Sequence, residues 1–227
     1  VHLKLENMQT TGSFKSRGVV VQMAKAPASV TSCERGLVTL SAGNYGKSFA
    51  CACHQRGVKG TVVMPQTAPK SREQIIRSKG CDVIRRESSE LFQKVKELED
   101  IEGMVFLHPF DDLDLIAGYG SAGIEMAEDT EPDIVLVCCG GGGLVSGVSA
   151  GLRHKGCKDT KIYAVDFDAK IAKATKQLFE RGLVVEPSGA AAFAALVSGK
   201  VPELKGTVVV VVTGGNASAT ELSEVFA

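Results

Sequence analysis

Apolar and polar residues form two kinds of segment along the chain. Short continuous apolar runs bounded by turns predict buried strands, and apolar residues spaced three or four apart predict amphipathic helices. We expect strands at residues 1–5, 37–40, 60–64, 82–84, 105–107, 134–139, 162–165 and 207–212. We expect helices at residues 14–25, 45–56, 70–79, 88–99, 113–126, 147–155, 170–181 and 190–198.

The regular alternation of strands and helices defines the expected fold class. Strands that are joined through helices run parallel, and such a sheet is covered by helices on both faces. We therefore predict an α/β protein with two domains of mainly parallel sheet flanked by helices. A small mobile domain of residues 36–118 is expected to be inserted into a larger domain formed by residues 1–35 and 119–227.

Three glycine-bearing turns follow predicted strands, at the sheet edge where open α/β sheets bind their ligands. They are Ser41–Asn44, Gly140–Gly143 and Thr213–Asn216. The four consecutive glycines come shortly before a predicted helix, so their backbone amides can converge on an anion without obstruction by side chains. No Gly-Lys-Ser/Thr closes this four-glycine loop, as it would in a nucleotide phosphate loop, and the loop lacks the glycine spacing of a dinucleotide loop. A phosphate site of another kind is therefore favoured over a nucleotide site.

Lys15 is a candidate reactive amine because of its place in the sequence. It lies in the first turn of a predicted helix, where the helix dipole and Arg17 both disfavour a protonated amine. A neutral amine near an anion site is what imine formation with an aldehyde requires. A lysine at the start of a helix is more often a solvated surface charge, and only the neighbouring motifs favour reactivity here.

Five motifs, taken in order, resemble those of one known enzyme family. They are Lys4–Gly18, Ser41–Asn44, Gly140–Gly143, Glu186–Ala190 and Gly214–Asn216. In this order they resemble the serine/threonine dehydratase and serine racemase family of pyridoxal-phosphate enzymes, whose fold is known as type II or tryptophan-synthase-β-like. The resemblance extends over nearly the whole chain.

The resemblance implies a role for residues in each motif. Lys15 would be the catalytic residue, to which pyridoxal 5'-phosphate is attached. The other implied cofactor-binding residues are Phe14 against the pyridine ring, Asn44 at the phenolic oxygen, Thr213 at the pyridine nitrogen, and Gly140, Gly141, Gly142, Gly143 and Leu144 at the phosphate. The implied substrate-binding residues are Ser41, Ala42, Gly43 and Asn44 at the carboxylate and Glu186 near the substrate end of the pocket.

The implied activity is dehydration of L-serine or L-threonine to a 2-oxo acid and ammonia. Racemases of this family carry a serine where this chain has Ala42, and that serine returns a proton on the face of the cofactor opposite the lysine. A methyl group cannot carry a proton, so dehydration is favoured. A serine racemase, a lyase for another β-hydroxy amino acid such as 3-hydroxyaspartate, and a catalytically degenerate regulatory protein of the same fold stay open as alternatives.

Composition narrows the expected partners. Lysine plus arginine and aspartate plus glutamate both number 26, so no basic excess favours nucleic acid or an anionic membrane, and we expect neither as a partner. No apolar run approaches the roughly 20 residues that cross a bilayer. The expected partner is a small amino-acid substrate, and the resemblance implies a homodimer.

The seven cysteines are an odd number in a chain that needs no disulfides to fold, which favours a reducing compartment, the cytoplasm. Cys51 and Cys53 are followed by His54, but no second pair of ligands is evident for a zinc site. Buried thiols on a helix are the favoured interpretation of this cluster.

The chain departs from the family pattern between Asp166 and the helix expected from Lys170. Family members carry several dozen further residues there, and we expect that a segment beside Asp168, Ala169 or Lys170 is missing from the printed sequence, as are residues before Val1. Asp166 matches a position where relatives have a glutamate that binds Mg²⁺, Ca²⁺ or a monovalent cation. A cation at Asp166 is therefore a prediction, and a solvated aspartate at the end of a strand is the alternative.

Overall fold

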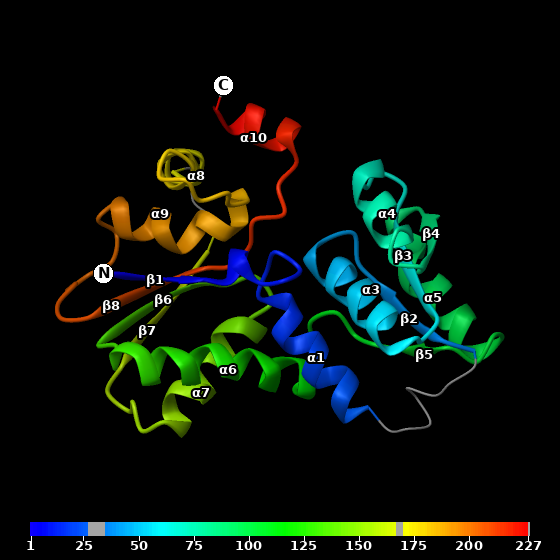
Figure 1. Ribbon diagram of the computed structural model, residues 1–227, viewed down its shortest axis with the longest axis horizontal. Helices are drawn as coiled ribbons and strands as arrows, with labels where there is room; N and C mark the ends of the chain where they lie inside the picture. The colour runs from blue at the N-terminus through cyan, green and yellow to red at the C-terminus, as the bar shows by residue number, and fades with distance from the viewer. Residues whose placement is uncertain (27–34, 167–169, 227) are drawn as a thin grey trace. The chain divides into compact units, whose positions relative to one another are not determined.

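Two parallel β-sheets flanked by helices make up the fold (Figure 1). The structure is a computed structural model that describes residues 1–26, 35–166 and 170–226. The strand orders are β1-β8-β6-β7 and β4-β3-β2-β5, and every neighbouring pair is parallel. The α/β class with mainly parallel sheets, which the sequence predicts, is confirmed.

Contacts between Cα atoms divide the chain into two compact units. Unit 1 comprises Val1–Phe14 and Ile116–Ala227, and unit 2 comprises Lys15–Leu115. Each unit contains one of the two sheets. The domain boundaries expected at residues 36 and 118 stay a prediction.

Unit 2 holds the sheet β4-β3-β2-β5 and the first helices of the chain. Its strands are β2 (Leu37–Leu40), β3 (Gly60–Pro65), β4 (Asp82–Arg86) and β5 (Val105–Phe106). Its helices are α1 (Lys15–Lys25), α3 (Asn44–Arg56), α4 (Lys70–Arg77), the 3₁₀ turn η2 (Ser88–Glu90) and α5 (Leu91–Asp100).

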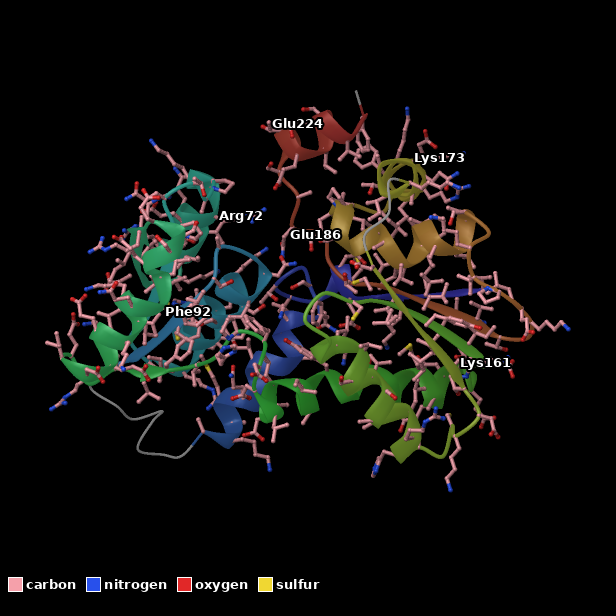
Figure 2. The ribbon with its side chains drawn as sticks, turned by 180° about the vertical axis from the view of Figure 1, so that it is seen from behind. Arg72, Phe92, Lys161, Lys173, Glu186 and Glu224 are labelled. Carbon is pink, nitrogen blue, oxygen red and sulfur yellow. The ribbon has the colours of Figure 1, made fainter. Side chains whose placement is uncertain are left out.

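The helix α5 covers one face of this sheet through a stripe of apolar side chains. Leu91, Val95 and Leu98 recur at helical spacing and pack against Val38 and Val63 of the central strands. Phe92 lies outside that stripe and is exposed on the outer side of the helix (Figure 2). The amphipathic pattern that predicts this helix from sequence is therefore the pattern that fixes its buried face.

On the other face of the sheet, α3 packs closely at the start of β3. A Cβ atom placed on Gly60 would lie 2.8 Å from the sulfur of Cys53, 2.8 Å from that of Cys81 and 3.1 Å from the Phe49 ring. Gly60 is therefore the residue that lets α3 approach the strand. The hydrogen bond with Cys81 and burial raise the pKa of the Cys53 thiol, which stays protonated.

Unit 1 is built around the sheet β1-β8-β6-β7. Its strands are β1 (His2–Leu5), β6 (Ile134–Cys138), β7 (Lys161–Val165) and β8 (Val208–Val212). Its helical segments are η1 (Glu6–Met8), most of α6 (Leu113–Thr130), α7 (Gly143–His154), α8 (Ile171–Phe179), η3 (Pro187–Ala190), α9 (Ala191–Val197) and α10 (Ala219–Phe226). Figure 1 shows α6 and α7 on one face of this sheet and α8 and α9 on the other.

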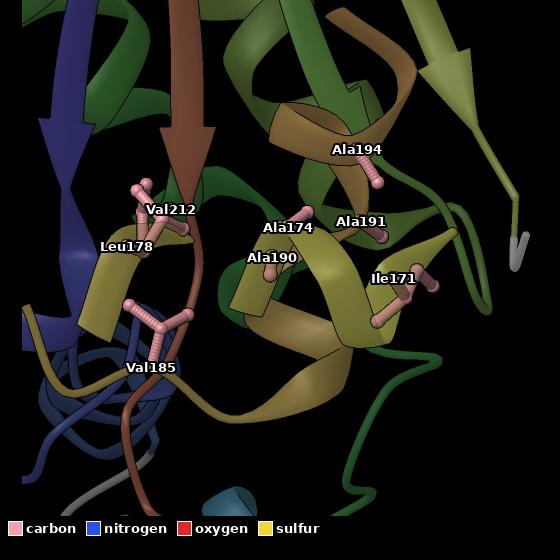
Figure 3. Packing of buried hydrophobic residues seen from close by; sticks show 8 residues of the cluster. All are labelled: Ile171, Ala174, Leu178, Val185, Ala190, Ala191, Ala194 and Val212. Carbon is pink, nitrogen blue, oxygen red and sulfur yellow. The ribbon is translucent and has the colours of Figure 1, made fainter. Parts of the chain in front are cut away.

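A cluster of small and branched side chains joins α8 and α9 to β8 (Figure 3). Leu178 of α8 and Val185, in the loop that follows it, lie near Val212 at the end of the strand. All three side chains are fully or almost fully buried. The carboxyl end of β8 is thus held in a packed core directly beneath Thr213.

Several elements differ from the sequence-based expectation. The helix α6 runs four residues beyond its expected end at Met126. The helix expected at residues 147–155 begins four residues earlier, because Gly143 already has helical geometry, so the last glycine of Gly140–Gly143 belongs to α7. The helix α10 was not expected from the sequence, and none of its side chains is buried. No helix among the described residues is both long and apolar enough to cross a membrane.

The close approach at Gly60 yields a stability prediction. Gly60→Ala should destabilise the protein by about 1–3 kcal/mol, because the added methyl group must displace two sulfurs and a ring in a packed core. Urea unfolding would measure the loss. In a chain that also carries Cys53→Ala and Cys81→Ala, the cost of Gly60→Ala should fall, and an unchanged free energy of unfolding in the single variant would contradict the packing described here.

Candidate active site

The carboxyl end of β8 is bound by backbone hydrogen bonds to a segment near the start of the chain. The amide of Phe14 donates to the carbonyl oxygen of Thr213 at 3.1 Å, and the amide of Gly215 donates to that of Gly12 at 2.9 Å. Between them, Ser13 and Gly214 form an antiparallel bridge. The motifs Thr11–Phe14 and Thr213–Asn216 therefore form one short two-stranded ladder in unit 1.

A side chain closes the end of this ladder. Asn216 Nδ2 donates to the carbonyl oxygen of Thr11 at 2.9 Å. Gly12 has a φ of +76°, and a Cβ atom there would lie 2.4 Å from Asn216 Oδ1. Both the left-handed backbone and the close amide therefore require glycine at position 12.

The loop Glu186–Gly189 lies against the same end of β8. The amide of Glu186 donates to the carbonyl oxygen of Gly214 at 3.0 Å, and the amide of Thr213 donates to that of Gly189 at 3.3 Å. A Cβ atom on Gly189 would lie 2.2 Å from the Gly214 oxygen, so only glycine permits this approach. Glu186 is partly buried and lies in the loop between α8 and η3 (Figure 2).

The glycine-rich loop follows β6, the strand next to β8. Gly142 has a φ of +82° and caps α7, whose first residue is Gly143. Cβ atoms placed on Gly140 and Gly142 would meet no other atom within 4 Å, so the space beside their backbone is open. The first amides of a helix have no partner within the helix, and together with its positive dipole they form a binding site for an anion.

Thr213 and Cys138 end the two neighbouring strands and touch each other. Cys138 Sγ and Thr213 Oγ1 are 3.2 Å apart, and either atom can be the donor of this hydrogen bond. Thr213 is only 3% exposed. Burial raises the pKa of the Cys138 thiol, and the hydrogen bond with Thr213 offsets part of this rise.

An aromatic pair fixes the residue that precedes Lys15. The rings of Phe14 and Tyr119 meet edge to face with centroids 4.8 Å apart, and the Tyr119 ring is buried. The Phe14 backbone is held at the same time by Thr213. Lys15, the first residue of α1, follows Phe14 directly in the sequence.

The side chain of Lys15 lies in unit 2. Its Nζ donates to the carbonyl oxygen of Pro109 at 3.2 Å and lies 5.9 Å from the centre of the Tyr45 ring. Burial lowers the pKa of this amine from 10.5 to about 8. The amine is therefore partly neutral near physiological pH, which is the state that can attack a carbonyl carbon.

The turn Ser41–Asn44 comes at the carboxyl end of β2, also in unit 2. Ser41 Oγ accepts hydrogen bonds from the amides of Gly43, at 3.2 Å, and Gly46, at 3.0 Å. Arg72 donates to the carbonyl oxygen of Ala42 at 3.1 Å. The turn is thus held from both sides, and Asn44 begins α3 directly after it.

Comparison with known proteins identifies the family of this chain. Residues 1–169 match the family model described as "Pyridoxal-phosphate dependent enzyme". The chain belongs to this family of pyridoxal-phosphate dependent enzymes. The resemblance seen in the sequence is thereby confirmed, and so is pyridoxal phosphate as the cofactor of the family.

Individual relatives of this pyridoxal-phosphate enzyme are similar over different shares of their length. An L-threonine ammonia-lyase of Thermotoga maritima is 40% identical over 156 residues, which are 67% of this chain and 38% of that protein. The match therefore spans less than half of that relative. An L-threonine dehydratase of Staphylococcus aureus is 31% identical in an alignment that covers 100% of this chain and 82% of that protein.

A solved structure shows the same fold. The serine racemase of Dictyostelium discoideum superposes with a TM-score of 0.83 at 27% identity, over 95% of this chain and 87% of that one. The alignment with the S. aureus dehydratase has 285 positions, more than this chain has residues, so that relative carries residues without a counterpart here.

The residues of unit 1 fit the two polar ends of the cofactor. The open space at Gly140 and Gly142 and the amides that begin α7 suit a phosphate. The buried hydroxyl of Thr213 can donate to an aromatic nitrogen. In unit 2, the pKa of Lys15 suits attachment to an aldehyde.

The structure groups the expected site residues into two sets. Unit 1 brings together Phe14, Glu186 and Thr213 by hydrogen bonds around the end of β8, and Gly140–Leu144 follow the neighbouring strand. Unit 2 contains Lys15 and Ser41–Asn44. Their roles stay predictions.

Three contacts in these sets were not expected from sequence. Cys138 contacts Thr213, and both Tyr45 and Pro109 contact Lys15. None of these three residues lies in a motif that the sequence predicts to form the site. Tyr45 follows Asn44 directly, and that adjacency is the one signal that pointed to it.

The cation expected at Asp166 stays a prediction. In the part of the chain that the structure describes, no three His, Cys, Asp or Glu side chains gather into a group that could hold a metal ion. Asp166 is exposed at the end of β7, while Asp168 and Ala169 lie outside the described residues, as does Cys33. The other six cysteines are free thiols, and Cys51, Cys53 and His54 form no metal cluster.

The low pKa of Lys15 predicts how cofactor uptake depends on pH. Because only the neutral amine reacts, the rate of covalent uptake by the apoprotein should rise with pH to a midpoint near 8, the pKa of this amine. Stopped-flow absorbance would follow the reaction, with Nα-acetyl-lysine as the control, whose amine should titrate about two units higher. A midpoint equal to that of the control would show that burial does not lower the pKa of Lys15.

Proposed function

We propose that this protein is a pyridoxal-phosphate-dependent lyase that dehydrates L-serine or L-threonine to a 2-oxo acid and ammonia. The observation that carries this proposal is the place of Lys15. Its amine has a pKa of about 8. Lys15 directly follows Phe14 in the sequence, and the backbone of Phe14 is hydrogen-bonded to Thr213. The Thermotoga and Staphylococcus relatives are named for the same reaction of threonine.

Residues of the sequence motifs would hold the cofactor. The amides of Gly140–Gly143 and Leu144 would bind its phosphate, and the Thr213 hydroxyl would donate to its ring nitrogen. Phe14, whose ring contacts Tyr119, would lie against the cofactor ring, and Asn44 would donate to the phenolic oxygen. When bound, pyridoxal phosphate supplies an electron-withdrawing ring that stabilises negative charge at the substrate's Cα.

Lys15 would then move the proton that the reaction requires. Its amine would hold the cofactor and would accept the proton from the Cα of the substrate. Burial supports the second role, because an amine with a pKa of about 8 is partly neutral at neutral pH. An exposed lysine with a pKa near 10.5 would be almost fully protonated there.

The turn Ser41–Asn44 would bind the substrate's carboxylate through its amides. Ser41 Oγ and Arg72 already fix this turn, and fixed donors lose little entropy on binding. The amide of Gly43 donates to Ser41 Oγ in the structure, so it must be shared or released when the carboxylate binds. Glu186 would lie at the substrate end of the site.

Ala42 favours dehydration over racemisation. Racemisation requires a second proton donor on the face opposite Lys15, and a methyl group provides none. The Dictyostelium racemase shares the fold, so the fold itself does not decide between the two reactions. A lyase for 3-hydroxyaspartate and a degenerate regulatory protein would each be separated from this proposal by turnover of serine and threonine.

The remaining expectations belong to the same proposal. A homodimer and a location in the cytoplasm follow from the resemblance to the dehydratase family and from the cysteine content. A cation at Asp166 would complete the site at the end of β7. Each of them is independent of the roles of Lys15 and Thr213.

The attachment of the cofactor gives the first test. Purified protein with pyridoxal phosphate should show a visible absorption band that shifts on addition of L-serine, and Lys15→Ala should lack the band and lose turnover to pyruvate by at least about 10³-fold. Lys25→Ala is the matched control, since Lys25 is an exposed lysine on the same helix. A Lys15→Ala variant with the band and turnover of the unmodified chain would exclude Lys15 as the attachment point.

The ratio of products gives the second test. The unmodified chain should form 2-oxo acid much faster than D-serine, because no proton donor stands at Ala42. Ala42→Ser should raise the rate of D-serine formation by about tenfold or more relative to pyruvate, as expected for a restored acid–base group. Ala42→Gly, which adds no hydroxyl, is the control. Interconversion of the serine enantiomers by the unmodified chain as fast as pyruvate forms would overturn the dehydratase assignment.

A further inference from the structure

The contact between Cys138 and Thr213 has a consequence for the cofactor nitrogen. The two side chains end neighbouring parallel strands, β6 and β8, and meet at 3.2 Å between Sγ and Oγ1. They are 75 residues apart in the sequence. The inference drawn from this contact rests on the proposed function, in which Thr213 faces the ring nitrogen.

A hydroxyl has one proton to donate and two lone pairs that accept. If Thr213 donates its proton to the sulfur of Cys138, that proton is not available to a ligand. If the thiol donates to Thr213 Oγ1, the hydroxyl proton is directed away from the sulfur and can be given to a ring nitrogen. The direction of this one hydrogen bond therefore decides whether Thr213 can act as a donor.

In the proposed function Thr213 gives its single hydroxyl proton to the ring nitrogen, so the thiol is the group that can donate across the 3.2 Å contact. Burial raises the pKa of Cys138, with smaller contributions in the same direction from the charges of Glu186 and Cys139, and the hydrogen bond with Thr213 offsets part of this rise, so the thiol keeps its proton. A sulfur that keeps its proton can donate, whereas a thiolate can only accept and would attract the hydroxyl proton of Thr213.

We propose that Cys138 is a positioning residue, whose S–H donates to Thr213 Oγ1 and so directs the hydroxyl proton of Thr213 toward the ring nitrogen of bound pyridoxal phosphate. The thiol touches Thr213 and acts through it. It orients a neutral donor without adding a charge to the site, so the ring nitrogen accepts a hydrogen bond and gains no full proton from a hydroxyl.

The chain contains a matched control in the next residue. Cys139 directly follows Cys138, the last residue of β6. Its sulfur lies 3.9 Å from the carbonyl oxygen of Gly140. Replacement of Cys139 therefore changes the same chemical group next to the same loop and leaves the contact between Cys138 and Thr213 in place.

The experiment compares four variants of the full chain: Cys138→Val, Cys138→Ser, Cys139→Val and Thr213→Val. Valine keeps the volume and suits a strand but cannot donate, whereas serine restores a donor. The readouts are the dissociation constant of pyridoxal phosphate by equilibrium dialysis and the pH at which the visible band of the bound cofactor titrates. Thermal unfolding of each apoprotein checks that the variant is folded, and Cys138→Ala replaces Cys138→Val if the latter is not.

Cys138→Val should weaken pyridoxal-phosphate binding by about three- to tenfold and shift the pH midpoint of the band. Cys138→Ser should restore both within about twofold, and Cys139→Val should change neither. In a Thr213→Val background, Cys138→Val should have no further effect, because the group through which it acts is gone.

Two results would overturn the inference. One is a Cys138→Val variant that binds the cofactor with the affinity and pH midpoint of the unmodified chain. The other is an equal loss in the Thr213→Val background, which would indicate a packing role for Cys138. Failure of the unmodified chain to take up pyridoxal phosphate would instead overturn the proposed function, so the two failures are distinguishable.

Discussion

The ladder between Thr11–Phe14 and Thr213–Asn216 is the constraint on which the site depends. Each of its backbone hydrogen bonds contributes only about 1 kcal/mol, but they join segments about two hundred residues apart in sequence. Glu186–Gly189 bonds to the same strand end, so a single edge of the sheet fixes three motifs. Gly12 and Gly189 are required there because any side chain would push the segments apart.

Lys15 shows that the site is arranged for chemistry at a cost in stability. A lysine whose pKa falls from 10.5 to about 8 on folding binds fewer protons in the folded than in the unfolded chain between these two values. Its burial therefore opposes folding fully below pH 8, and the penalty is relieved as the pH rises toward 10.5. Solvation would remove the penalty, but it would also leave the amine protonated and unable to react.

Much of the fold could be predicted from the sequence, because buried parallel strands such as Val208–Val212 are continuous apolar runs and helices such as Leu91–Asp100 are strongly amphipathic. The order of the strands in each sheet and the contact between Cys138 and Thr213 could not, since pairing between distant segments leaves no local pattern. The early start of α7 was missed because four glycines predict a loop, while the capping geometry at Gly142 allows Gly143 to begin the helix.

In the proposed function, pyridoxal phosphate is attached to the amine of Lys15, the residue that directly follows Phe14 of the ladder in sequence. This attachment is tested by reduction of the cofactor-loaded protein with sodium borohydride, followed by proteolysis and mass spectrometry of the labelled peptide. We expect one phosphopyridoxyl group, located on Lys15. A label on another lysine, with Lys15 unmodified, would contradict it.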